Sequence, residues 1–204
     1  MTVATDVRIR MGGCCPDFHE PLHAQMSSGK YDWPVSILEL EDYDVWLSEH
    51  RTARKRAARA HRLGYRFDRI ERANHEDAIY RINTSKEKRQ GRPMTAAYQE
   101  RQTFNPLPVY RCDRHRVDTY GILHGELVAY LVLYRSGDLL LVSQILGHAD
   151  HLESDVMYLM MVEAFGGASL PATVFYNRWD SGTDGLRYFK SKLGFGPERV
   201  TWEI

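Results

Sequence analysis

The chain has 204 residues, 43% of them hydrophobic and 26% charged, and its 27 Lys and Arg balance its 27 Asp and Glu. This composition indicates one compact globular domain, and it excludes a globally basic nucleic-acid coat, an acidic tail, a fibre and a repeat protein. No apolar run approaches the roughly 18 residues of a membrane span, and the first residues lack the apolar core of a signal peptide. Three Cys do not make a disulfide framework. We therefore expect a cytoplasmic protein with no membrane partner.

The first half of the sequence predicts an irregular N-terminal arm over residues 1–34, where Gly, Pro and Ser are frequent, and a transferase-sized domain over 35–204. The elements expected next follow from apolar periodicity and from capping residues. They are a short strand over 35–40, one helix over 42–63 that ends at Gly64, a strand over 66–72, and a helix that begins at Asn74 and stops near 91–93.

The second half predicts strands joined by tight turns, followed by alternating helices and strands. His124-Gly125 between two apolar runs is a hairpin signal, and residues 136–138 predict a second turn. The expected elements are strands over 116–123, 127–134 and 139–146, a helix over 155–165, a strand over 172–176, a helix over 185–193 and a strand over 200–204. An antiparallel meander followed by strand–helix–strand crossovers predicts an α/β fold with a mixed sheet.

Positive charge is concentrated in one part of this neutral chain. Between Arg51 and Arg92 there are about 14 Lys and Arg against about 5 Asp and Glu. Four of them share one face of the helix predicted over 42–63, at a spacing that can follow a phosphate backbone: Arg51, Lys55, Arg59 and Arg62. This face predicts a docking surface for tRNA or DNA; the alternative is a solvated helix face.

Two segments resemble the GNAT acyltransferase superfamily. "YGILHGELVAYLVLY" (residues 120–134) is similar to the family's central hairpin, and "GLRYFKSKLGF" (residues 185–195) is similar to its last helix and the Leu-Gly-Phe that follows. The resemblance covers residues 65–204 in element order. It implies a single GNAT-like domain that transfers an acyl group to an amine.

The loop that binds coenzyme A in ordinary GNAT enzymes is altered here. That family has a glycine-rich loop whose backbone N–H groups hold the pyrophosphate, whereas residues 147–154 read "GHADHLES". Glu153 and Asp155 are expected to repel the pyrophosphate, and Lys190 aligns with the family's general-acid Tyr.

Both departures resemble the Fem-type aminoacyl transferases, whose donor is aminoacyl-tRNA. "RTARKRAARAHRLGY" (residues 51–65) and "FKSKLGF" (residues 189–195) are also similar to segments of that group. The resemblance implies aminoacyl-tRNA as donor, with acyl-CoA as the alternative. Fem-type enzymes usually carry two such domains, whereas this chain has one.

Acyl transfer to an amine needs a base or a water chain, an oxyanion donor and an acid. In a GNAT-like sheet the reacting centre lies where the last meander strand and the next parallel strand diverge. This position makes Ser143, His148, Tyr176 and Lys190 the catalytic candidates. His148, or else His151, is the expected base, Tyr176 the acid, and Lys190 a ligand for a substrate phosphate or carboxylate. The alternatives are hydrated loop histidines, a core tyrosine and a surface lysine.

A donor-rich segment, "INTSKEKRQGRPM" (residues 82–94), lies where a helix gives way to a Gly-Arg-Pro loop. Polar side chains at this density predict a binding loop for an anionic or amide substrate. The candidate substrate-binding residues are Asn83, Ser85, Arg89, Gln90 and Arg92. A solvated helix end is the alternative.

Cys and His residues occur in two short groups. A zinc or iron site would form if the N-terminal arm packed against the second group, the ligands being Cys14, Cys15, Cys112 and His115. No standard zinc-finger spacing is present, so reduced Cys without metal is the default expectation.

Three functions remain in competition at this point. The first is a GNAT-like transferase that moves an acyl or aminoacyl group onto a small-molecule amine. The second is an enzyme that modifies nucleic acid, either a DNA base amine or tRNA, with the basic helix on the phosphates. The third is a non-catalytic binding module.

Overall fold

The computed structural model describes residues 6–10, 34–89, 91–107, 109–110, 112–180 and 182–203, with the backbone alone described at 6–10 and 201–203. The strands are β1 (Asp6–Arg10), β2 (Val35–Leu40), β3 (Arg66–Arg69), β4 (Lys88–Arg89), β5 (Arg92–Pro93), β6 (His115–His124), β7 (Glu126–Ser136), β8 (Leu139–Gly147), β9 (Ala172–Arg178) and β10 (Gly196–Glu203). The helices are α2 (Tyr43–Glu49), α3 (Arg51–Arg62), α4 (Glu76–Thr84), α5 (Ala96–Gln99), α6 (Val156–Gly166) and α7 (Asp184–Lys192), with 3₁₀ turns η1 (Arg72–His75) and η2 (Ala149–Ser154).

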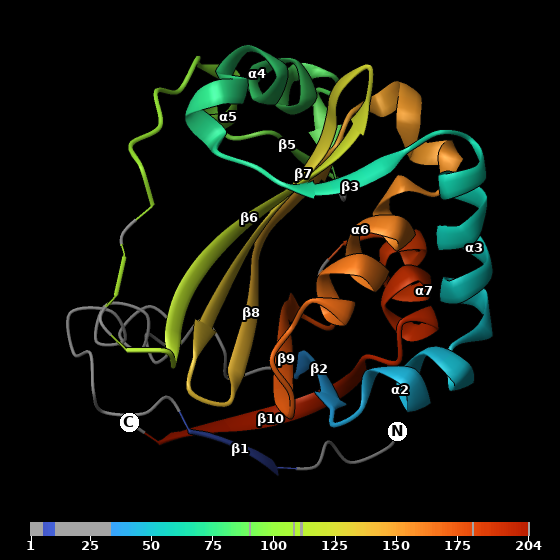
Figure 1. Cartoon of the computed structure of the whole chain (residues 1–204), viewed down its shortest axis with the longest axis vertical. Helices are drawn as coiled ribbons and strands as arrows, with labels where there is room; N and C mark the ends of the chain where they lie inside the picture. The colour runs from blue at the N-terminus through green and yellow to red at the C-terminus, as the bar shows by residue number, and fades with distance from the viewer. Residues whose placement is uncertain are drawn as a thin grey trace.

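One mixed sheet organises the described part of the chain (Figure 1). Its eight strands lie in the order β1-β10-β2-β9-β8-β7-β6-β3, and β4 and β5 form a separate hairpin. The meander β6-β7-β8 is antiparallel, and β8 pairs in parallel with β9 across the α6 crossover. The strands β7 to β9 were predicted in this order, and the mixed α/β sheet is confirmed.

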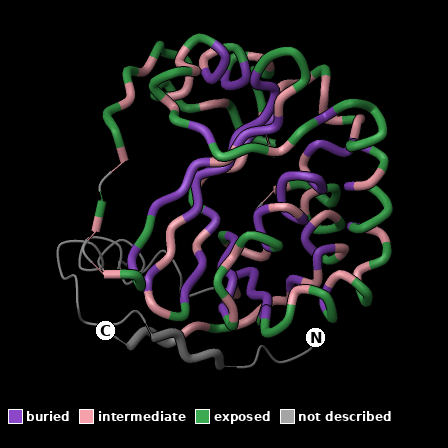
Figure 2. The backbone as a smooth tube through the Cα atoms, viewed as in Figure 1, coloured by how far each residue is buried: buried purple, intermediate pink, exposed green. Residues whose placement is uncertain are grey.

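The sheet is covered on both faces, and each face has its own apolar cluster. One cluster joins α2, α3 and α6 to the sheet, and the other joins α4 to β7. Figure 2 shows the buried backbone concentrated in the central strands and in α6. Helix α6 is apolar on nearly all sides, which is expected for a crossover helix packed between the sheet and α3.

The N-terminal region differs from the predicted arm in one respect. Asp6–Arg10 forms β1 and pairs in parallel with β10. The rest of the arm, with Cys14 and Cys15, lies outside the described residues.

The helix predicted over 42–63 is two helices, because the chain breaks at His50. The backbone of His50 leaves the helical region (φ −95°, ψ 57°), and its ring stacks on buried Trp46 at 5.2 Å between centroids. The same imidazole also packs against Gly194, where an added Cβ would lie 2.3 Å from His50 Nε2. Packing against the α7–β10 turn therefore overrides the local helical preference.

The second predicted helix is shorter than expected and is followed by a hairpin. Helix α4 is capped at His75, one residue after the predicted Asn74, and ends at Thr84. The chain then forms β4 and β5, and Gly91 has the positive φ of 77° that the tight turn requires. The hairpin lies against the end of β8, and this contact positions the site described next.

Strands β8 and β9 diverge part of the way along the sheet. Their parallel pairing spans Leu139–Leu141 and Thr173–Phe175, after which β8 continues beside β7 alone. A bulge at the divergence leaves Ser143 as the extra residue of β8, since Val142 and Gln144 pair with consecutive residues of β7. The opened edge is where the sequence placed the reacting centre.

Candidate functional site

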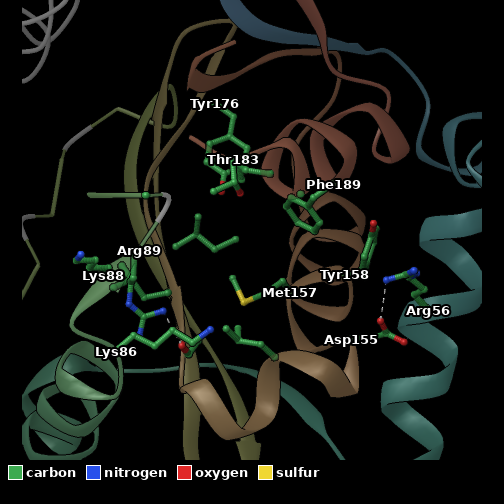
Figure 3. A pocket seen from close by; sticks show the side chains of 17 residues that line it. Arg56, Lys86, Lys88, Arg89, Asp155, Met157, Tyr158, Tyr176, Thr183 and Phe189 are labelled. Atoms are coloured by element: carbon green, nitrogen blue, oxygen red, sulfur yellow. Dashed lines mark hydrogen bonds and ion pairs between the residues drawn. The ribbon is translucent and has the colours of Figure 1, made fainter. Parts of the chain in front are cut away.

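A cavity of about 510 Å³ opens at the divergence of β8 and β9, between the β4–β5 hairpin and the N-terminal ends of α6 and α7 (Figure 3). We call it the charged cavity, and its lining comprises Arg56, Lys86, Lys88, Arg89, Gly91, Ile145, Leu146, Gly147, Leu152, Asp155, Met157, Tyr158, Tyr176, Thr183, Gly185, Leu186 and Phe189. Apolar side chains form its middle, and charged groups lie at two opposite sides (Figure 3).

Four cations and one acid line the charged cavity. Lys86, Lys88 and Arg89 come from the hairpin side, and Arg56 comes from α3 on the other side. The acid is Asp155, whose carboxylate accepts from Arg56 Nη1 at 3.2 Å and, outside the lining, from Arg59 Nη1 at 2.8 Å. Because Asp155 is paired with two guanidinium groups, part of its negative charge is balanced within the protein, and the expected repulsion of a pyrophosphate stays a prediction.

Arg89 and Ser85 join the hairpin to the loop after β8. Arg89 Nη1 donates to the Gly147 carbonyl at 3.0 Å, and its Nη2 donates to Ile82 O at 2.6 Å and to Ser85 Oγ at 2.9 Å. Ser85 Oγ also accepts from the Ala149 amide at 3.0 Å. Both residues were predicted to bind substrate, and this stays a prediction: their side chains have partners within the protein, while Arg89 also lines the charged cavity.

Three further amides of the loop are also engaged. The His148 amide donates to Val128 O at 2.8 Å, the Asp150 amide to His148 Nδ1 at 3.4 Å, and the His151 amide to His148 O at 3.1 Å. In a coenzyme A site these amides would point at the pyrophosphate. Here four consecutive N–H groups, from 148 to 151, already have partners, so this loop offers little to a pyrophosphate.

Tyr176 is the predicted catalytic residue that lies at the centre of the site. It is 7% exposed, and its hydroxyl has no hydrogen-bond partner among the described residues, although its side chain lines the cavity. An ordinary tyrosine is protonated at neutral pH, and burial raises the pKa of Tyr176 further. The side chain is therefore a hydrogen-bond donor available to a bound molecule.

Lys190 lies behind Tyr176 and does not reach the cavity. It is fully buried, its Nζ donates to the Arg178 carbonyl at 2.7 Å, and Nζ lies 4.9 Å from the centre of the Tyr176 ring. Burial lowers the pKa of Lys190 to about 8, with Asp180 acting in the opposite sense. The predicted direct contact with a substrate phosphate is not present in this arrangement, because the side chain faces the core.

A second cavity of about 230 Å³ shares Arg89, Ile145, Leu146 and Tyr176 with the first. We call it the neutral cavity, and its lining is completed by Pro93, Met94, Thr95, Tyr98, Val142, Ser143, Gln144 and Asn177. Predicted residue Ser143 is exposed here, at the bulge of β8. Tyr176 therefore lies between a cavity rich in charge and one that is nearly free of it.

His148 is not among the residues that line either cavity. It caps η2 and lies with His151 and His124 in a cluster of imidazoles, with ring centroids 5.8 Å (His148–His151) and 6.0 Å (His124–His151) apart. The Tyr65 hydroxyl is hydrogen-bonded to His151 Nδ1 at 2.8 Å, and burial together with the two neighbouring imidazoles lowers the pKa of His151. The structure therefore does not bring the predicted base, or its alternative His151, to Tyr176.

Of the other described residues predicted to bind substrate, Asn83 and Arg92 line neither cavity. Asn83 is buried and accepts from the Tyr130 hydroxyl at 2.8 Å, so its role is in the core. Arg92 is exposed on β5, and Gln90 lies outside the described residues. Lys86 and Lys88 were missed, although they belong to the donor-rich segment and their alternate spacing before Gly91 is the signal of one face of a hairpin.

The basic helix face is present on α3, with Ala53, Ala57 and Ala60 buried beneath it. Arg51, Lys55 and Arg62 are exposed. Arg59 is engaged with Asp155 and with the Glu153 carbonyl, so it belongs to the contact between α3 and α6.

Within the described ranges, no group of three or more Cys, His, Asp or Glu side chains is arranged to hold a metal ion. Cys112 Sγ lies 2.9 Å from His115 Nδ1. Among the helices of this part of the chain, none is both long and apolar enough to cross a bilayer.

No protein-family model matches the sequence, and no curated protein matches it significantly. Among solved structures, the fold is similar to the C-terminal domain (DUF2156) of an Agrobacterium fabrum protein described as a lysylphosphatidylglycerol synthetase. The TM-score is 0.54 at 13% identity, over 89% of this chain and 69% of that chain. The likeness bears on the fold alone, and the mixed sheet of the described residues is compatible with a single GNAT-like domain.

Proposed function

We infer that this protein is a transferase that moves an aminoacyl group from the 3′ end of an aminoacyl-tRNA onto an amine. The observation that carries this proposal is the charged cavity, which meets an unpartnered phenol at the divergence of β8 and β9. The name of the similar Agrobacterium protein also contains an aminoacyl group, lysyl. Three features of the described residues support the donor, the chemistry and the docking surface in turn.

The distribution of charge in the cavity favours an RNA 3′ end over coenzyme A. The loop amides from 148 to 151 are already bonded, so the backbone cradle for a pyrophosphate is occupied by protein groups. The cations are instead side chains on two sides of the cavity, Lys86 and Lys88 facing Arg56. Separated cations suit phosphates that are spaced along a strand, whereas a pyrophosphate needs several donors at one point.

Tyr176 supplies the proton that the reaction needs. The amine nitrogen attacks the ester carbonyl of the aminoacyl group, the new C–N bond forms, and the C–O bond to the ribose breaks. Tyr176 donates its proton to the leaving ribose oxygen and regains one from the amine, through water. The phenol is protonated before attack, as an ordinary tyrosine is at neutral pH, and burial raises its pKa further.

Helix α3 supplies the docking surface for the body of the tRNA. Arg51, Lys55 and Arg62 are exposed on its outer face, and Arg56 continues this charge to the cavity. Reversing Arg51 and Lys55 to Glu should weaken tRNA binding at low salt without disturbing the ion pairs of Asp155. A slope of log K against log salt that is smaller by about 2 is expected from two lost phosphate contacts. An unchanged slope would remove α3 from the docking surface.

The catalytic proposal is tested with Tyr176→Phe and the matched control Tyr158→Phe. Both tyrosines are buried and line the charged cavity, but only Tyr176 also lines the neutral cavity. With tRNA charged with labelled amino acids and a mixture of small amines, Tyr176→Phe should slow transfer about 100-fold, and Tyr158→Phe much less. Equal loss in both variants would refute the role of Tyr176. Faster acylation from acetyl-CoA than from charged tRNA would refute the donor.

A further inference from the structure

The neutral cavity differs from its neighbour in charge as well as in size. Apolar and aromatic side chains make up much of its wall, including Met94, Tyr98, Val142 and Ile145. The remaining lining side chains are mostly uncharged hydrogen-bonding groups, such as Ser143. Its volume of about 230 Å³ is below the roughly 300–1,000 Å³ of sites for drug-sized ligands. The space therefore suits a compact group about the size of one amino-acid side chain.

The one charged residue in this lining is Arg89, and its guanidinium is committed to the protein. Nη1 and Nη2 are bonded to Gly147 O, Ile82 O and Ser85 Oγ, which fixes the plane of the guanidinium. A phosphate in this cavity would find none of the lysines that line the charged cavity. A second ammonium group would find no carboxylate, because neither Asp nor Glu lines it.

Ser143 and Tyr176 place polar atoms at the point where a bound amine would react. The Ser143 hydroxyl is on the bulge of β8, exposed, and without a hydrogen-bond partner among the described residues. Tyr176 lines both cavities. An amine whose body fills the neutral cavity can donate to Ser143 Oγ while its nitrogen faces an acyl group held in the charged cavity.

We propose that the neutral cavity is the acceptor subsite, and that the acceptor is a monoamine with a compact, uncharged apolar or aromatic body. The word "acceptor" rests on the proposed function, but binding of the amine in this cavity does not require that transfer occurs. It separates the acceptor from polyamines, nucleotides and DNA bases, which carry additional charge. Phenethylamine is the probe that matches this chemistry, and spermidine and adenosine 5′-monophosphate are the charged comparisons.

The experiment is calorimetric titration of the three probes into the full chain. Phenethylamine should bind at least 10-fold more tightly than spermidine, and adenosine 5′-monophosphate should not compete with it. Ser143→Trp fills the cavity from an exposed position of β8 and should weaken phenethylamine binding at least 10-fold. Ser48→Trp, an exposed position on α2 outside both cavities, should leave the affinity within 2-fold.

A second variant covers the case in which Ser143→Trp does not fold. Met94→Lys introduces a charge into the same lining and should also weaken phenethylamine at least 10-fold. Tighter binding of spermidine, competition by adenosine 5′-monophosphate, or unchanged phenethylamine affinity in the folded variants would overturn the assignment. Failure of transfer with intact phenethylamine binding would instead contradict the proposed function and leave the apolar amine subsite standing.

Discussion

Ser85→Ala is the substitution that most directly tests how the loop after β8 is held. Ser85 Oγ donates to Ile82 O at 2.8 Å and accepts from Arg89 Nη2 and the Ala149 amide, at 2.9 and 3.0 Å. The variant leaves the half-buried Ala149 amide without this partner and removes one bond from a guanidinium that keeps two others. An unsatisfied amide of this kind lowers the free energy of unfolding by about 1–3 kcal/mol. The lost hydrogen bond from Arg89 Nη2 lowers it by somewhat less, because the guanidinium keeps its other partners. We expect a total loss of about 2–3 kcal/mol in the free energy of unfolding.

The assay is urea denaturation followed by circular dichroism, with Thr84→Ala as the matched control. Thr84 is the preceding residue, is exposed, and bonds only to Tyr80 O within α4. Ser85→Ala should lower the urea midpoint by about 1 M at an unchanged slope, and Thr84→Ala should cost no more than about 0.5 kcal/mol. Hydrogen exchange at the Ala149 amide should also become faster. A Ser85→Ala loss no larger than that of the control would mean that the hairpin does not hold the loop.

Three further predictions concern buried charge and donor binding. Asp155→Asn keeps the left-handed backbone (φ 63°) that Asn tolerates but removes the ion pairs to half-exposed Arg56 and Arg59; urea denaturation should show a loss of about 1–2 kcal/mol that shrinks in 1 M salt, and a salt-independent loss would contradict the ion-pair account. For Lys190, whose pKa falls from 10.5 to about 8 on burial, the unfolded chain holds a proton between these pH values that the folded chain has lost. Stability of the parent relative to Lys190→Met should therefore rise between pH 8 and 10, by at most about 1.4 kcal/mol per pH unit, and a flat difference would show that Lys190 titrates normally. Acetyl-CoA should bind weakly by calorimetry, and tight binding on residues 147–154 would restore an ordinary acetyltransferase.

The sheet could be predicted from the sequence because its strands are long, apolar and separated by unambiguous turns. Residues 127–134 and 139–146 fall within β7 and β8, and Gly125 and Gly137 both have the positive φ expected of their turns. The order of strands and helices was then sufficient to predict the parallel contact across α6. Local pattern and tertiary packing favour the same structure in this half of the chain.

The helical half was less predictable because contacts distant in sequence decide it. Nothing local ends a helix at His50, whose conformation follows from stacking on Trp46 and packing against Gly194. Likewise, Lys190 was predicted to contact a substrate phosphate or carboxylate, with a surface lysine as the alternative, but its Nζ bonds to a carbonyl at the end of β9. The position of Tyr176 beside the cavity could be predicted because it depends only on the divergence of two strands. The engagement of Arg59 by Asp155 could not, since the two lie 96 residues apart in the chain.

Around Gly147 the positive charge comes from side chains of the hairpin, whereas a glycine-rich loop supplies it from backbone amides. In a glycine-rich loop the positive potential comes from backbone amides that converge on one point. Here the hairpin uses Ser85 and Arg89 to satisfy that loop, and it carries Lys86 and Lys88 on the same segment. Compared with a glycine-rich loop, the positive charge here is carried by longer side chains spread along the cavity wall and not by fixed backbone dipoles. Such side chains can follow a ligand whose negative charges are spaced apart, and the proposal of a polynucleotide end as donor rests on this property of the hairpin.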